Sequence, residues 1–170
     1  MPSAAGKGLP HMRPIQRLGL LVGLILGISV VLPATVLATT SETIDGTWQA
    51  QGSATPTATP GVYAVHDSGV GVATNVGSYT LAASEFASFT TGEISDGSWT
   101  LTTPAGDTLA ASYAGSLSWT GPAAITFASP GQITGGSGRF AGATGTIVFS
   151  GTADMTTGHI IGSFVANLNR

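Results

Sequence analysis

The stretch that decides the fold is residues 133–146, which read ITGGSGRFAGATGT. Five of these fourteen residues are glycine, and glycine adopts a positive φ and lets two backbone segments cross closely. Residues 146–153, directly after it, alternate between apolar and small or polar side chains as a strand does. A phosphate-binding loop would need a following helix and a GK[ST] motif, and neither occurs here. We therefore expect a tight junction between two strands of an all-β barrel, with Phe140 as a plug of the core.

The same alternation extends along the chain on both sides of this junction. Residues 107–120 (DTLAASYAGSLSWT) place mostly apolar side chains at odd positions and small or polar ones at even positions. This predicts a long strand with one buried face, bent or bulged at Gly115. Shorter runs predict strands at residues 43–54, 70–81, 98–103, 146–153 and 159–168. Turn sequences lie at residues 53–61, 95–97, 104–107, 120–122, 129–131 and 156–158. Seven or eight short-turned strands predict a closed barrel or a sandwich.

The N-terminal segment has the layout of a secretory signal peptide. Lys7, Arg13 and Arg17 precede an uncharged apolar run at residues 18–32, and Pro33 ends it. Small and aliphatic residues up to Ala38 predict cleavage after that residue. The alternative is an uncleaved anchor, because residues 18–38 hold no charge and about 20 apolar residues span a membrane. We expect a signal peptide at residues 1–38, a single β-barrel domain at residues 39–170, and a secreted or cell-envelope location.

Composition excludes several classes of function. The chain has no cysteine, which rules out disulfides, thiol catalysis, cysteine-ligated metals and a lipoprotein anchor. After residue 38, Arg139 and Arg170 are the only basic residues against eight acidic ones, a formal net charge of −6. Binding to nucleic acid needs a basic surface, so we expect none, and no association with the membrane once the signal is cleaved.

Three motifs resemble the allene oxide cyclase-like barrels, in their secreted bacterial branch, to which plant dirigent proteins are more distantly related. The strongest is GGSGRFAGATG at residues 135–145; the others are GVATNVG at residues 71–77 and GDTL at residues 106–109 with Tyr113 and Gly115. The resemblance implies an eight-stranded antiparallel barrel that forms homodimers or homotrimers. The plant cyclase of this group uses an apolar cavity to steer a fatty-acid epoxide. Its catalytic residues match no position here, so none is carried over.

Aromatic side chains are the candidates for lining a pocket in such a barrel, because core and pocket lining share one surface. The candidate ligand-binding residues are Trp48, Tyr79, Trp99, Tyr113, Trp119, Arg139 and Phe149. Arg139 could clamp a ligand carboxylate, although an ion pair or a packed stem over the corner is the simpler expectation. His66 and His159 form no metal-binding spacing, so we predict no metal and no cofactor. Either Glu85 or Glu93 could be a buried carboxylate, but a solvent-exposed loop is expected for both.

These observations lead to three hypotheses of function. The first is the binding of a small apolar molecule in the barrel interior or mouth, without an assigned catalytic residue. The second is a cyclase or isomerase acting on a reactive apolar substrate, which requires an inward ionisable group; Glu85, Asp107 and Arg139 are the candidates. The third is a structural or cell-envelope interaction protein, which the surface rich in threonine and serine favours.

Overall fold

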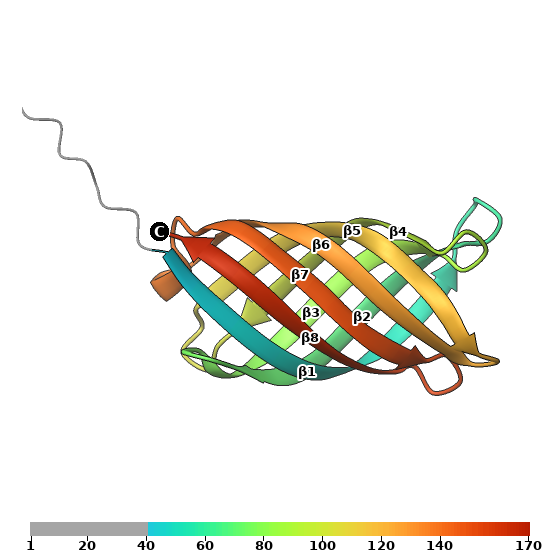
Figure 1. The fold of residues 1–170 in the computed structure, drawn as a ribbon, viewed down its shortest axis with the longest axis horizontal. Helices are drawn as coiled ribbons and strands as arrows, with labels where there is room; N and C mark the ends of the chain where they lie inside the picture. The colour runs from blue at the N-terminus through green and yellow to red at the C-terminus, as the bar shows by residue number, and fades with distance from the viewer. Residues whose placement is uncertain (1–40) are drawn as a thin grey trace, which may run out of the picture. The chain divides into compact units, whose positions relative to one another are not determined.

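The computed structural model describes residues 41–170, which form eight antiparallel strands closed into a barrel (Figure 1). The strands follow one another in chain order, and β8 pairs with β1 to close the ring. Their bounds are β1 (Ser41–Pro56), β2 (Val62–Ala73), β3 (Gly77–Ser88), β4 (Glu93–Thr102), β5 (Thr108–Gly121), β6 (Ala124–Gly136), β7 (Thr144–Asp154) and β8 (His159–Asn169). The predicted all-β class and the eight-stranded antiparallel barrel are confirmed. The predicted signal peptide and the alternative anchor lie outside the described residues. Within those residues, no helix is both long and apolar enough to cross a membrane.

The period-two pattern sorts side chains into an interior and an outer surface. In β1, Ile44, Trp48 and Ala50 are at most 9% exposed, whereas the intervening Thr47 and Gln49 are exposed. The alternation predicted for residues 159–168 is present in β8: the buried face holds Ile160, Phe164, Ala166 and Leu168, and the exposed face holds Ile161 and Val165. One face of each strand thus forms a continuous apolar core inside the ring.

The glycine-rich stretch at residues 133–146 is a strand junction, as predicted, and it closes one end of the barrel. It joins β6 to β7 through a short 3-10 helix, η1 (Gly138–Phe140). Gly135 and Gly138 have φ values of 142° and 57°, conformations in which other residues are strained. This geometry turns Phe140 into the barrel, where it is fully buried and serves as the predicted plug.

Arg139 belongs to η1 at this closed end, and its side chain is exposed. Its guanidinium donates a 2.5 Å hydrogen bond to the backbone oxygen of Asn75 and lies 5.1 Å from the centre of the Phe140 ring. It therefore packs over the corner as expected, although its hydrogen-bond partner is a carbonyl and not an acid. Arg170 forms an ion pair with Glu42 and lies over the same ring. Both arginines of the described chain thus cover the closed end.

The predicted strand at residues 70–81 is wrong, because a turn at residues 74–76 divides it between β2 and β3. Asn75 in this turn has a φ of 59°, a left-handed conformation that asparagine tolerates better than most residues. Valine and threonine on both sides of the turn have strand propensity, which hides it in the sequence. The predicted loop at residues 53–61 is shorter than expected, because β1 continues to Pro56.

A bulge in β4 replaces the predicted turn at residues 95–97. The register of β4 shifts against β3 and again against β5 in this segment, so β4 carries one extra residue there. Asp96 within the bulge has a φ of 51°. The extra residue reverses the alternation of the strand: Ile94 points inward before the bulge and Gly97 after it.

The predicted turn at residues 129–131 is also wrong, because these residues lie within β6. Pro130 pairs with Val148 of β7 on one side. On the other side the β5–β6 ladder has no residue pair at this position, and proline has no backbone N–H to donate there. Its side chain is exposed, which turns the preceding Ser129 toward the interior, where it is 1% exposed.

Candidate functional site

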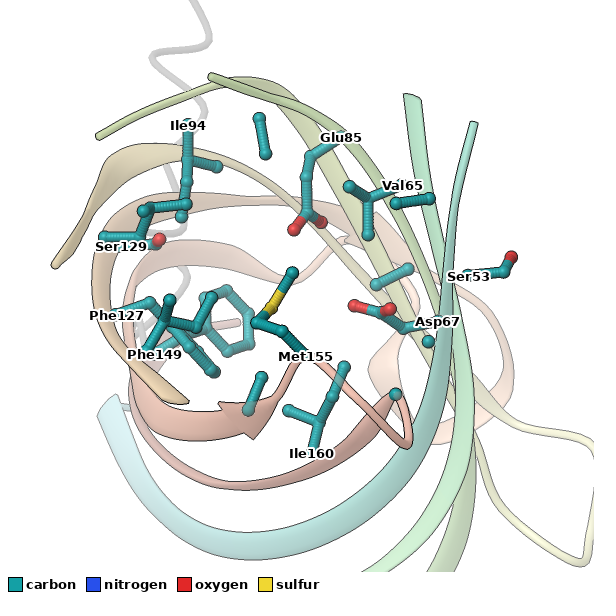
Figure 2. Close-up of a pocket in the computed structure, with 18 of the residues that line it drawn as sticks. Ser53, Val65, Asp67, Glu85, Ile94, Phe127, Ser129, Phe149, Met155 and Ile160 are labelled. Atoms are coloured by element: carbon teal, nitrogen blue, oxygen red, sulfur yellow. The ribbon is translucent and has the colours of Figure 1, made fainter. Parts of the chain in front are cut away.

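The interior of the barrel is hollow at the end opposite Phe140. This open end carries the β1–β2, β3–β4, β5–β6 and β7–β8 turns, on the side away from the C-terminus in Figure 1. The cavity has a volume of about 400 Å³, and residues of all eight strands line it. Met155 in the β7–β8 turn also contributes to the lining, and its side chain points inward in Figure 2. Cavities of this size are typical of small-molecule sites.

Two carboxyl groups, those of Asp67 in β2 and Glu85 in β3, point into this cavity (Figure 2). Asp67 pairs across the sheet with Ala83, and Glu85 pairs with Val65. The two acidic residues are therefore diagonal neighbours on the inner face of adjacent strands, with Cβ atoms roughly 7 Å apart. Glu85 was expected in a solvent-exposed loop, and this expectation is wrong, because β3 extends through it.

Tyr113 of β5 reaches across β4 to donate a hydrogen bond from its phenol to Oε2 of Glu85. The ring crosses over Gly97, where a Cβ atom would lie only 2.4 Å from the ring carbons. The β4 bulge brings Gly97 to this inward position, so the missing side chain makes room for the Tyr113–Glu85 pair. Glycine is required here by close approach and not by its φ.

The environment shifts the acid–base properties of all three groups. Burial raises the pKa of Asp67 to about 7, and the charge of Glu85 contributes to this rise. Burial also raises the pKa of Glu85, against the opposing effects of the Tyr113 hydrogen bond and the charge of His66. Burial, together with the Glu85 charge, raises the pKa of Tyr113, so its phenol remains a proton donor. Asp67 is thus divided between its protonated and ionised forms near neutral pH.

Four buried polar atoms on the cavity lining have no hydrogen-bond partner within the described chain. They are Oδ1 of Asp67, Oγ of Ser129 and the indole Nε1 atoms of Trp48 and Trp99. Oδ1 of Asp67 lies against Gly52, where a Cβ atom would be 2.5 Å away. An unpaired buried polar group costs about 1–3 kcal/mol, so these four atoms lower the stability of the barrel.

The charge of the cavity is negative. No lysine or arginine lines it among the described residues, because both arginines lie at the closed end. Asp154 adds a carboxylate at the mouth, where hydrogen bonds from the backbone N–H groups of Thr156 and Thr157 lower its pKa. The described residues contain no cluster of three or more acidic or histidine side chains that could hold a metal ion.

The structure brings together four of the seven predicted ligand-binding residues. Trp48, Trp99, Tyr113 and Phe149 all line the cavity. Tyr79 is buried nearer the closed end and donates a hydrogen bond to the backbone oxygen of Thr47. The remaining two, Trp119 and Arg139, lie elsewhere.

Trp119 is 48% exposed at the end of β5, where its indole N–H donates to the backbone oxygen of Phe89. Of the three ionisable candidates for an enzyme, only Glu85 enters the cavity. Asp107 lies in the β4–β5 turn at the closed end, beside Gly138. His66 and His159 are both exposed.

Sequence reasoning missed Asp67 and Ser129 and underrated Glu85. The alternation of the strand could have indicated Glu85, because Tyr79 and Leu81 are inward residues at odd positions. Continuing the odd positions through residue 83 places Glu85 on the same inner face. The same continuation through β2 leads from Val65 to Asp67. Ser129 was hidden by the turn-like sequence that surrounds it.

A second hollow, of about 790 Å³, lies open on the outer surface over β1, β2, β3 and the β4–β5 turn. Its lining includes four threonines and two valines, together with the buried Trp48 and Tyr79. No acidic or basic side chain lines it, so the interior cavity is the better candidate site.

Comparison with known proteins finds no matching family model, no matching curated protein and no matching solved structure. The function of this chain is therefore inferred from the geometry of the barrel and its cavity.

Proposed function

We propose that this barrel binds a small, largely apolar molecule in its open end. The observation that carries the proposal is the cavity of about 400 Å³, which is lined by aromatic side chains and by the inward carboxyl groups of Asp67 and Glu85 (Figure 2). A packed core would leave no such space, since interiors are filled to nearly crystalline density. At about 30 Å³ per water molecule, the volume corresponds to roughly a dozen waters or to a ligand with a fused ring system.

The aromatic rings around the cavity support an apolar ligand body. Trp99 and Phe149 lie 5.2 Å apart between ring centres, and Tyr113 and Phe149 are at the same separation. Phe127 lies 6.1 Å from Trp48 on another part of the wall. These rings offer flat apolar contact, while the carboxyl groups of Asp67 and Glu85 would orient the ligand.

A matched pair of variants tests this proposal. Ala83 lines the cavity and Ala82 beside it faces outward, so Ala83→Phe fills the interior whereas Ala82→Phe does not. The neutral dye N-phenyl-1-naphthylamine should fluoresce on binding to the wild type and to Ala82→Phe, and Ala83→Phe should lose most of this signal. Circular dichroism checks folding, and Ala153→Leu, nearer the mouth, replaces Ala83→Phe if that variant does not fold. Absence of dye binding to the wild type, or equal binding by both variants, would overturn the proposal.

A second candidate function is a cyclase or isomerase acting on a reactive apolar substrate in the same cavity. The specific observation that favours it is the inward Glu85–Tyr113 pair beside Asp67. Burial raises the pKa of Asp67 to about 7, which suits proton exchange at neutral pH. The test is to generate an unstable apolar epoxide in the presence of the protein and to measure the enantiomeric excess of the ring product. We expect an excess with the wild type and its loss with Glu85→Gln; racemic product from both removes this candidate.

A further inference from the structure

We propose that the ligand carries a protonated amine on its apolar body and that Asp67 and Glu85 receive this amine. This inference rests on the proposed binding function and narrows the class of ligand. The feature that carries it is the convergence of two carboxyl groups from adjacent strands on one aromatic cavity (Figure 2).

The two carboxyl groups have unused hydrogen-bonding capacity. Oδ1 of Asp67, a residue only 9% exposed, has no partner, and the side chain points into the cavity from β2. Glu85 accepts one hydrogen bond, from Tyr113, whereas a carboxylate can accept about four. An ammonium group has three donors and no acceptor, so it fits a site with these open acceptors.

The charge of the cavity selects a cation over an anion. Buried carboxylates without a positive partner are costly, and no lysine or arginine of the described chain lines this cavity. A monocation would neutralise part of the charge of Asp67 and Glu85, whereas a ligand carboxylate or phosphate would add to it. Asp154 at the mouth extends the negative potential outward, toward the path by which a ligand enters.

An organic amine fits better than a metal ion. Only two carboxyl groups converge here, and the described residues hold no cluster of three metal-ligating side chains. The surrounding rings, among them Trp48 and Trp99, can contact both a cation and its apolar body.

Three compounds that share one ring system test the inference. They are 2-(2-naphthyl)ethylamine, 2-(2-naphthyl)ethanol and 2-naphthylacetate, measured by isothermal titration calorimetry at pH 8 and low salt. We expect the amine to bind about tenfold or more tightly than the alcohol, the scale of a hydrogen bond to a charged group, and the carboxylate to bind most weakly. Asp67→Asn and Glu85→Gln should each reduce this preference for the amine while leaving the affinity for the alcohol nearly unchanged.

Glu93→Gln is the matched control, because it removes one carboxylate from the exposed outer surface. It should keep the full preference for the amine. If the alcohol binds as tightly as the amine, or if the two cavity variants keep the wild-type ratio, the amine inference is wrong and the proposed binding function stands. If none of the three compounds binds, both are wrong.

The pH dependence gives an independent measurement. Glu85 and Tyr113 are the ionisable groups that face Asp67 inside the cavity. His66, the neighbouring residue on β2, is exposed on the outer surface, and Asp154 lies at the mouth of the cavity. The amine stays protonated between pH 8 and pH 5, whereas Asp67, whose pKa burial raises to about 7, takes up a proton in this range. The ratio of amine to alcohol affinity should therefore fall as the pH is lowered, and a constant ratio would contradict the inference.

Discussion

Asp67→Asn keeps the size of a buried side chain and removes its charge, and we expect this substitution to stabilise the barrel above neutral pH. Asp67 has an ordinary pKa of 3.8, and burial raises it to about 7 in the folded chain. Between these two values the folded state holds a proton that the unfolded chain has released. The contribution of the protonated Asp67 to the free energy of unfolding is therefore fully present below pH 3.8. It is lost as the pH rises toward 7, by up to about 1.4 kcal/mol per pH unit.

Over this whole pH range, the ionisation of Asp67 lowers the free energy of unfolding of the wild type by on the order of 4 kcal/mol. Asparagine does not ionise, so Asp67→Asn does not lose this stability on going from pH 4 to pH 8. Urea unfolding of the wild type and the variant at half-unit pH intervals measures the difference directly. Ionisable groups that the two proteins share largely cancel in that difference.

Asp154→Asn is a control of opposite sign. Hydrogen bonds from the backbone N–H groups of Thr156 and Thr157 lower the pKa of Asp154, so this carboxylate contributes stability that is lost as the pH falls. The Asp154→Asn variant should be less stable than the wild type at pH 7, with the difference shrinking under acid. If the difference for Asp67→Asn is the same at pH 4 and pH 8, Asp67 is not a buried ionisable group and the electrostatic argument for the cavity fails.

Three further substitutions test other parts of the structure. Gly97→Ala should lower the unfolding free energy by roughly 1–3 kcal/mol in urea titrations, because its Cβ would lie 2.4 Å from the Tyr113 ring, whereas Gly121→Ala, with 3.9 Å of clearance, should be nearly neutral. Phe140→Ala should cost about 3–5 kcal/mol by the same assay, because it empties the fully buried plug; a loss below about 1 kcal/mol would show that the closed end is not packed. Arg139→Ala should leave the affinity for the naphthyl compounds unchanged in calorimetry, since this side chain lies at the opposite end from the cavity; a tenfold loss would place the ligand elsewhere.

The sequence predicts the barrel well where alternation and glycine act locally. The faces of β5 and β8 and the junction that buries Phe140 follow from side-chain period and from backbone conformations available to glycine. These features depend on residues that are near one another in the chain. They can be predicted without knowing which strands become neighbours in the sheet.

The candidate site is harder to predict because it depends on register and on bulges. Glu85 and Asp67 are acidic residues in segments rich in small side chains, and such residues are exposed far more often than buried. Their inward direction follows once β2 and β3 are extended beyond the predicted strand at residues 70–81, so that the alternation includes both positions. Gly97 acquires its role through the β4 bulge, which brings it beneath Tyr113 from the next strand.

The closure of the ring has a consequence for how the chain reaches this structure. Every strand pairing within residues 41–170 joins neighbours in the sequence except β1–β8, which brings Ser41 beside Asn169. Hairpins can form early, whereas this last pairing must wait for the loss of chain entropy that long-range contact requires. Until then β1 and β8 are two unpaired edges, and β8 carries Ile161 and Val165 on its outer face. Refolding at high concentration therefore places ring closure within one chain in competition with edge pairing between two chains.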